Sequence, residues 1–414
     1  MINVKTLFSS EKALFFFYAL FMGFFVWKMP MSTGDDAIFI NYRSSFEWIY
    51  VRYMSWSSRI VIDAIVPELC RHTVFFKGIT FGMLLTMPFL MAKLICPDEK
   101  TGYVYGICFL YCLFPMGGAG WIATMVNYYY VLFALCLSVY LLRFRDTNFL
   151  FVILILCAFY CINQEQACFL FLCVLAANIW QGSRDRRMLF LGCLTIAMLL
   201  FIVTAPGNRL RFASEITTWY PEFTSLSIVF KIYLGVAATL YNYILTPNPI
   251  SLFLLFCIFI NKYKSLQESL ARVLALFAVV ALHSFFVFSP SVAFQKESPV
   301  YLKDFSSSAA LPCFYFVVSV FCCAYVVYQC CQLLRDRDLR AKALLIFGAG
   351  LASRFVMGLS PTLFASGERT FLFCDFALLA LSLLFFTTAQ LPCKSYVVWG
   401  AVAMRLMLCC GKLV

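Results

Sequence analysis

Two adjacent carboxylates, Asp35 and Asp36, follow the first hydrophobic run of the chain. They begin a segment, residues 34–59, that is rich in aromatic and charged side chains and that also contains Glu47. A positioned carboxylate can act as a general base, because it takes a proton from an attacking hydroxyl group. The two acids could also bind a divalent cation, although two carboxylates alone form a weak site. A solvated loop without any chemistry is the alternative.

A third carboxylate, Glu165, interrupts an otherwise apolar stretch. It belongs to the polar tetrad at residues 163–166, which lies between two apolar arms. Each arm has about 15 residues, or roughly 22 Å of helix, which is short of the roughly 30 Å hydrocarbon core of a bilayer. We therefore expect the tetrad to lie below the outer surface, where a carboxylate needs a partner or a wet cavity. An exposed hairpin tip is the alternative.

Arginine side chains gather in the segments that we place on the external side of a membrane. The positive-inside rule disfavours arginine there, and its guanidinium group suits phosphate or a carboxylate partner. Structural ion pairs with Glu47, Glu215 or Glu368 are the alternative for each arginine. The candidate site residues on this side are Asp35, Asp36, Arg43, Trp56, Arg59, Glu165, Asn208, Arg209, Arg211 and Arg369.

An external acid beside several arginines fits one reaction well, the transfer of a sugar from a polyprenyl phosphate. The acceptor hydroxyl needs a base, which the acidic pair would supply, and the departing phosphate needs cationic donors. Arg209, Arg211 and Arg369 are the candidates for the phosphate. Tryptophans such as Trp56 could stack on sugar rings, whereas an aromatic belt at the membrane interface is the alternative for these rings.

Composition predicts the fold that must position these residues. The 414-residue chain is 63% hydrophobic and only 13% charged, and its mean hydropathy is +0.88. A soluble globular domain does not have this composition. The apolar runs are long and lack the period-2 alternation of a membrane β-barrel. We predict an all-α, polytopic membrane bundle of about 11–13 spans, with residues 1–414 forming a single integral domain.

The net charge and the cysteines do not require a separate function. The charge of +12 comes from short basic clusters between apolar runs, where they set topology and meet anionic headgroups, so we exclude nucleic acid as a partner. The 20 cysteines lie mostly inside apolar runs and form no paired C-x-x-C sets. We interpret them as packing residues and predict no zinc site, no disulfide framework and no cofactor.

Basic clusters orient the predicted bundle. The clusters around Arg143, Arg184 and Arg335 are placed in the cytoplasm by the positive-inside rule. The opposite side then holds four external segments, at residues 30–72, 205–227, 289–310 and 360–370, and we predict loops for the second and third of them.

Three apolar runs are harder to place. Residues 13–26 resemble a signal peptide, but no small-residue cleavage site follows, so we interpret them as a retained first span with a cytoplasmic N-terminus. Residues 227–245 contain a lysine and several tyrosines and are interpreted as an interfacial or partly inserted helix. Residues 396–410 form either a last span or an interfacial tail.

Five short motifs occur in order along most of the chain: the acidic pair, then WSSR at residues 56–59, NQE at 163–165, PGNRLR at 206–211 and SPTLFASGERT at 360–370. Together they resemble the bacterial O-antigen-modifying (serotype-converting) glucosyltransferases of the GT-C type. The resemblance implies a GT-C-like fold in the bacterial inner membrane with a periplasmic active site. It also implies transfer of glucose from undecaprenyl-phosphate-glucose to a lipid-linked or growing O-antigen glycan, part of lipopolysaccharide. The catalytic acid would lie in the first external loop, as Asp35 or Asp36.

Two other classes of function compete with the transferase. A flippase or other transporter of lipid-linked glycans should bury charges near the midplane of several spans and often has inverted repeats. Here the charges gather at one face and no repeat is evident. An O-antigen polymerase or ligase would concentrate its polar residues in one large external loop, whereas this chain distributes them over several. We therefore favour the transferase.

Overall fold

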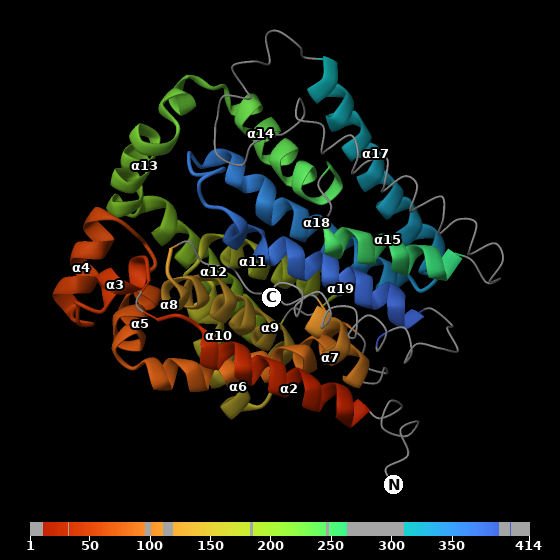
Figure 1. The fold of residues 1–414 in the computed structure, drawn as a ribbon, viewed down its shortest axis with the longest axis horizontal. Coiled ribbons are helices and arrows are strands. Elements are labelled where there is room, and N and C mark those ends of the chain that lie inside the picture. Colours follow the sequence, from red (N-terminus) through yellow and green to blue (C-terminus); the bar gives the residue numbers. More distant parts are fainter. Residues whose placement is uncertain are drawn as a thin grey trace, which may run out of the picture. The chain divides into compact units, whose positions relative to one another are not determined.

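The computed structural model describes residues 11–31, 33–95, 101–110, 119–182, 185–245, 248–262, 310–388 and 398. Within these ranges all regular elements are helices and no strand is present, so the predicted all-α class is confirmed (Figure 1). The chain divides into two compact units, Met1–Arg211 with Leu391–Val414, and Phe212–Gln390.

The first unit combines apolar helices with a group of short helices. Among the apolar helices, α2 packs on α6 and α7, α9 packs on α6 and α10, and α11 packs on α12. The apolar helices are α2 (Glu11–Lys28), α6 (Thr73–Ile95), α7 (Thr101–Leu110), α9 (Tyr130–Leu141), α10 (Asn148–Cys161), α11 (Glu165–Trp180) and α12 (Arg186–Thr204). The short elements are α3 (Asp35–Phe39), α4 (Phe46–Ser55), α5 (Ile60–Arg71), α8 (Trp121–Thr124), the π-helix η1 (Met125–Tyr129) and the 3₁₀-helix η2 (Leu142–Phe144).

The second unit is organised around α19 (Leu372–Thr388), which packs against both α15 (Pro249–Lys262) and α18 (Arg337–Phe355). The remaining elements are η3 (Pro221–Ser225), α14 (Ile228–Leu240), the π-helix η4 (Tyr241–Leu245), α17 (Ala310–Leu333), η8 (Val356–Leu359) and η9 (Glu368–Phe371). The helix α13 (Pro206–Trp219) begins in the first unit and ends in the second.

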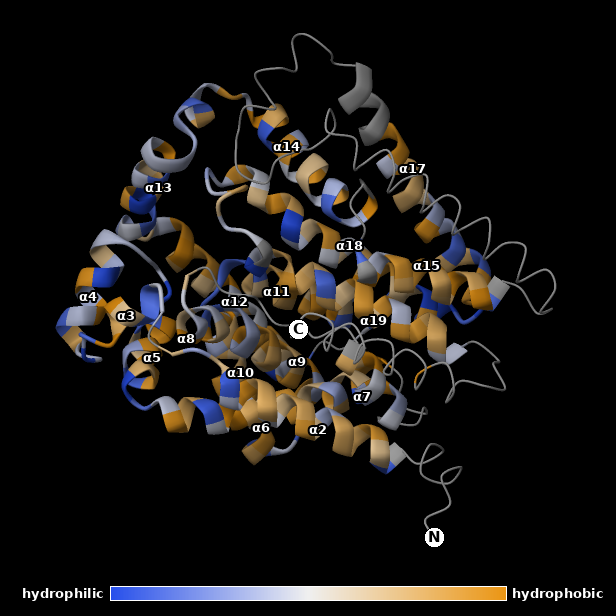
Figure 2. Ribbon diagram, viewed as in Figure 1, coloured by the Kyte–Doolittle hydropathy of each residue, from blue (hydrophilic) through white to orange (hydrophobic). Residues whose placement is uncertain are grey.

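Among the described residues, five helical stretches are long and apolar enough to cross a membrane: Thr73–Ile95, Trp121–Phe144, Arg186–Thr204, Arg337–Leu359 and Arg369–Thr388. The hydrophobic residues of these helices are orange in Figure 2. Only 28% of the apolar window of α12 is buried inside the protein, against 78% for Arg369–Thr388. The exposed apolar surface of α12 requires a nonaqueous neighbour, as lipid would be. The larger number of spans stays a prediction, and residues 263–309 and 399–414, where some of those spans were placed, lie outside the described residues.

The segment predicted as a loop after residue 205 is a helix, which corrects the sequence interpretation. Pro206 is the first residue of α13, and Asn208, Arg209 and Arg211 lie in its first two turns. Proline is favoured at the first helical position, because its missing N–H group has no intrahelical partner there anyway. Proline, glycine and asparagine also mark loops, and this ambiguity explains the wrong prediction.

In the second unit, α14 and η8 approach each other at two glycines. A Cβ atom on Gly235 would collide with the carbonyl oxygen of Phe355, and one on Gly358 would collide with the carbonyl oxygen of Lys231. A methyl group at either position would force the two backbones apart. By contrast, a Cβ atom on Gly348 in α18 would have no atom within 4 Å.

We expect Gly235→Ala to lower the free energy of unfolding by about 1–3 kcal/mol, because overpacking displaces two backbones. The matched control Gly348→Ala should be neutral or more stable by up to about 1 kcal/mol, since alanine is the better helix former. Thermal unfolding of the detergent-solubilised protein measures both. Equal melting temperatures for the two variants would contradict the close packing at Gly235.

Candidate functional site

The second acid of the pair, Asp36, caps a helix that starts 85 positions later in the chain. Its Oδ2 atom accepts a hydrogen bond from the Ile122 N–H at 2.9 Å, and its Oδ1 atom accepts one from the Ala123 N–H at 2.8 Å. These donors belong to the first turn of α8, which has no intrahelical partners for them. Gly120 precedes α8 with φ of +97°, and a Cβ atom there would lie 2.6 Å from Oδ1. The cap therefore requires both the carboxylate and the glycine.

The two acids have different environments. Asp36 is 1% exposed, whereas Asp35 lies on the surface of the unit. Burial raises the pKa of Asp36 above its ordinary value, although the hydrogen bonds from Ala123 and Ile122 oppose this effect. With both oxygens engaged by backbone donors, Asp36 is structural. Asp35 is the acid that a substrate could reach.

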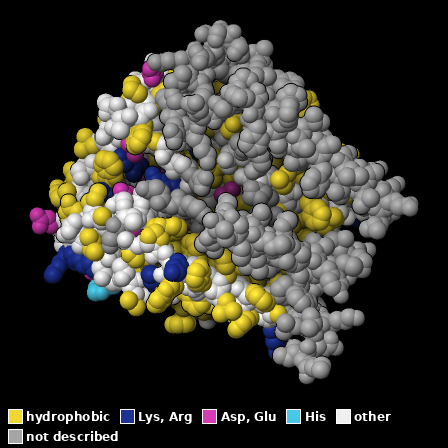
Figure 3. Space-filling view, viewed as in Figure 1, with side chains coloured by type: hydrophobic (Ala, Val, Ile, Leu, Met, Phe, Trp, Pro, Cys, Tyr) yellow, Lys and Arg dark blue, Asp and Glu magenta, His cyan; other side chains and the backbone are white. Residues whose placement is uncertain are grey.

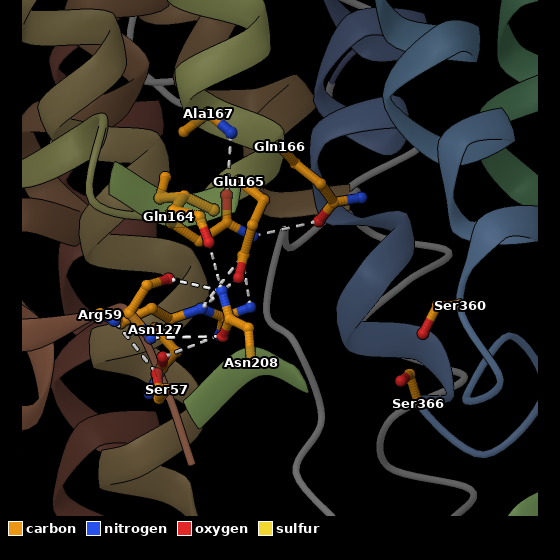
Figure 4. A network of polar contacts seen from close by, with 12 residues as sticks. Ser57, Arg59, Asn127, Gln164, Glu165, Gln166, Ala167, Asn208, Ser360 and Ser366 are labelled. Atoms are coloured by element: carbon orange, nitrogen blue, oxygen red, sulfur yellow. Dashed lines mark hydrogen bonds and ion pairs between the residues drawn. The ribbon is translucent and has the colours of Figure 1, made fainter. Parts of the chain in front are cut away.

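An ion pair joins the first external segment to the polar tetrad (Figure 4). The Nη2 atom of Arg59 lies 2.6 Å from Oε2 of Glu165, and its Nε atom lies 3.0 Å from the same oxygen. The Arg59 side chain is 16% exposed and that of Glu165 is 33% exposed. Two donors on one carboxylate form the strong, oriented kind of ion pair. Glu165 thus has the partner that its position required.

Asn127 supports this ion pair from a third element. Its side-chain oxygen accepts a hydrogen bond from Nη1 of Arg59 at 3.0 Å, and its Nδ2 group donates to the Ala123 carbonyl at 2.8 Å. Asn127 lies in the π-helix η1, a type of irregularity that is frequent at functional sites. The same helical stretch, α8 with η1, therefore contacts Asp36 at its start and Arg59 further along.

Two asparagines hold the backbone just around Arg59. The Val61 N–H donates to Oδ1 of Asn163 at 3.1 Å, and Asn208 exchanges hydrogen bonds with Ser58 at 3.0 and 3.3 Å. Asn163 is fully buried, so the alternative of an exposed hairpin tip is wrong. Three of the sequence motifs, at residues 56–59, 163–165 and 206–211, thus meet in one place.

Gly207 allows this meeting. A Cβ atom at this position would lie 2.5 Å from both the Trp56 N and the Tyr53 O atoms. The first turn of α13 therefore lies directly against the backbone at the end of α4, and only glycine fits. This close approach sets the position of Asn208 and of the two arginines that follow it.

A second ion pair, which sequence reasoning missed, lies beside the first. Nη2 of Arg52 is 3.3 Å from Oδ1 of Asp63, which is 4% exposed. The Trp48 indole donates to the Asp63 carbonyl at 3.0 Å, and the Arg52 guanidinium lies 5.5 to 5.9 Å from the rings of Phe39, Trp48 and Trp56. Trp56, predicted to stack on a sugar, is 41% exposed and contacts Arg52 as well.

The remaining predicted arginines occupy different settings. Arg43 and Arg209 are exposed, and Arg211 is half-buried and adds positive potential at Glu165. In the second unit, the half-buried Arg369 donates from Nε to the Ser366 carbonyl at 3.0 Å. The described contacts thus bring together Asp36, Arg59, Glu165, Asn208 and Arg211, while Arg369 belongs to the other unit.

The second unit contains a buried arginine and a half-buried aspartate that sequence reasoning also missed. Arg354 in α18 is 2% exposed, donates to the Leu363 carbonyl at 3.1 Å and lies 4.1 Å from the centre of the Phe371 ring. Tyr243 in η4 donates to Oδ1 of Asp375 at 2.7 Å. Their signal in the sequence is a charge inside an apolar run, which marks a functional candidate by default.

The residues of this site form a poor set of ligands for a metal ion. The described part of the chain contains no group of three or more His, Cys, Asp or Glu side chains that could hold one. At the acidic pair, a cation would have to displace two backbone donors from Asp36. Asp35 is the remaining carboxylate there, and a single carboxylate is a poor site for a divalent cation.

We expect the Arg59–Glu165 pair to have a coupling free energy of about 1–3 kcal/mol in a double-mutant cycle. The variants are Arg59→Met, Glu165→Gln and the combination, and unfolding in detergent is the measurement. The control cycle uses Arg71 and Glu68, a longer pair 3.5 Å apart on one helix whose side chains are 24% and 42% exposed, and its coupling should stay below about 0.5 kcal/mol. Equal coupling in the two cycles would show that the first pair contributes no more than a surface contact.

No family model, curated protein or solved structure matches this chain. The likeness to O-antigen glucosyltransferases therefore depends on the five short motifs. Because a fold alone does not determine a function, the functional interpretation depends on the chemistry of this site.

Proposed function

We propose that this chain is a membrane glycosyltransferase. It moves a sugar, glucose by the resemblance, from an undecaprenyl-phosphate donor to a lipid-linked or O-antigen glycan at the periplasmic face of the bacterial inner membrane. The observation that carries the proposal is the difference between the two acids. Asp36 is fixed by two backbone donors, and Asp35 is exposed. An exposed carboxylate on a rigid support suits a general base.

The acid and one of the cations are held by the same helical stretch, which supports this reaction. Asp36 caps α8 at Ile122, and Asn127, which accepts a hydrogen bond from Arg59, lies five residues further along. A sugar donor bound beside this stretch would meet a carboxylate and guanidinium groups that are fixed to one support.

The concentration of arginines near Glu165 supports recognition of a phosphate. Arg59 is paired with Glu165 and Arg52 with Asp63. Arg211, half-buried near Glu165, and the exposed Arg209 bring further positive charge to this part of the first unit. Cationic donors at a departing phosphate stabilise the charge that develops in the transition state. We assign Arg209 and Arg211 this role.

A flippase for lipid-linked glycans is the second candidate, because Arg354 and Asp375 are charges inside candidate spans. Their positions argue against it. Arg354 lies five residues from the end of Arg337–Leu359, and Asp375 lies six residues from the start of Arg369–Thr388. Both are therefore about 8–9 Å from a span end at 1.5 Å per residue, and a transporter places such charges near the midplane.

We expect Asp35→Asn to lower the transfer rate by about 10²–10⁴, because the amide keeps the shape of the side chain and cannot accept the proton. Its melting temperature should match that of the unaltered protein. Asp36→Asn is the matched control and should lower stability by about 0.5–2 kcal/mol, since an amide replaces one of the two capping oxygens by a donor. Transfer from a defined polyprenyl-phosphate sugar measures the rate. If the Asp35→Asn variant is fully active, Asp35 is not the general base.

We also expect Arg211→Ala and Arg209→Ala to weaken use of the donor by roughly 10- to 150-fold in kcat/KM, which corresponds to about 1.5–3 kcal/mol for a lost charged hydrogen bond. Arg143→Ala, at an exposed arginine outside the site, is the control. If the donor dependence of both variants equals that of the control, the phosphate binds elsewhere.

A further inference from the structure

Helix α4 has an inner face that is fixed to the first unit. Trp48 donates to the Asp63 carbonyl, and Arg52 pairs with Asp63. The Tyr53 ring lies at the edge of this face and stacks on Phe201 of α12, with centroids 4.9 Å apart and planes 17° from parallel. The contacts of Trp48 and Arg52 determine which side of α4 faces outward.

The outer face of α4 carries an apolar stripe, with the exposed acid Glu47 beside it. Phe46, Tyr50 and Met54 follow one another at four-residue spacing and are 85%, 56% and 39% exposed, and Val51 beside them is 50% exposed. Residues at this spacing line one face of a helix. The Phe46 and Tyr50 rings stack with their centroids 6.5 Å apart. No residue of α4 is buried, and hydrophobic side chains are visible at the surface on the side where α4 lies (Figure 3).

This stripe continues the exposed apolar surface of α12, a candidate membrane span. Through the Tyr53–Phe201 contact, α4 lies against the C-terminal part of α12. Leu200 and Val203, on either side of Phe201 in the sequence, are 60% and 67% exposed. If lipid covers these side chains of α12, the neighbouring stripe of α4 lies at the edge of the same lipid phase.

We propose that the Phe46–Tyr50–Met54 stripe is a membrane-docking surface and that α4 lies in the headgroup region of the bilayer. Ten residues, or about 15 Å of helix, cannot cross a bilayer, and charged residues within α4 fit an interfacial helix. The exposed Arg43, two residues before the cap Ser45, suits an anionic lipid headgroup. A second protein chain fits less well, because stable interfaces use about 20–30 residues on each side.

The docking also bears on the candidate site. Arg52 of α4 pairs with Asp63, whose N–H donates to the Arg59 carbonyl at 2.8 Å. A helix resting on the membrane would thus set the height of Arg59 relative to lipid headgroups. The proposal itself does not depend on the glycosyltransferase function, since any membrane protein with this arrangement would dock in the same way.

Photochemical cross-linking in the reconstituted full-length protein tests the proposal. Benzoylphenylalanine replaces Phe46 or Tyr50 on the stripe, Trp48 on the inner face, and Val203 on α12 as the lipid-facing reference. The vesicles contain phosphatidylethanolamine and phosphatidylglycerol with alkyne-tagged acyl chains. We expect lipid adducts at positions 46 and 50 at least fivefold above position 48 and comparable with position 203.

Two results would overturn the proposal. One is a yield of lipid adducts at positions 46 and 50 no higher than at position 48. The other is cross-linking of these positions mainly to a second copy of the chain, which would identify the stripe as a protein interface. Phe46→Gln combined with Tyr50→Gln provides an independent measurement, because α4 has no buried residue and should stay folded. Benzoylphenylalanine at position 51 should give fewer lipid adducts in this variant than in the protein with Phe46 and Tyr50 in place.

Discussion

The ion pair between Arg59 and Glu165 joins parts of the chain that are 106 residues apart. It lies at the start of α5 and at the start of α11, and its charges would be costly if either were left alone in partly buried surroundings. Asn127 contributes a third element, so the guanidinium is held from two directions. Around this contact, the backbone hydrogen bonds to Asn163 and Asn208 fix the chain on both sides of Arg59. The arrangement of the first external segment follows from these few polar contacts.

In the acidic pair, the buried Asp36 fixes the backbone that positions the exposed Asp35. Asp36 neutralises the N-terminal end of α8, where unsatisfied N–H groups and the helix dipole favour negative charge. Because this fixes the backbone of α3, the adjacent Asp35 is presented at the surface in a constant orientation. A general base benefits from such rigidity, since proton transfer requires precise geometry. The structural role of one acid thus prepares the chemical role proposed for the other.

Much of this organisation could be predicted from the sequence, because lipid tolerates only backbone that satisfies its own hydrogen bonds. Apolar runs therefore predicted helices, and a polar tetrad between short arms predicted that Glu165 lies below the outer surface and needs a partner or a wet cavity, of which the structure shows the partner, Arg59. The choice between the two acids could not be predicted, since it depends on a helix that starts 85 positions later. Asn127 was overlooked because the π-helix around it follows from tertiary contacts and leaves no pattern in the sequence. Arg354 and Asp375 were overlooked because runs were judged by average hydropathy.

The cap between Asp36 and α8 also has a consequence for biogenesis. A membrane protein is synthesised from its N-terminus, so the carboxylate exists before the helix that needs it. Until residues 122 and 123 reach Asp36, the first turn of α8 must direct its N–H groups to water or to the translocation machinery. Closing a loop of this length has an entropic cost that grows only slowly with the number of residues. The cap can therefore form once α8 has been synthesised, before Asn163, Glu165 and Asn208 of the same unit exist, and a substitution at position 36 would leave the start of α8 without its two acceptors.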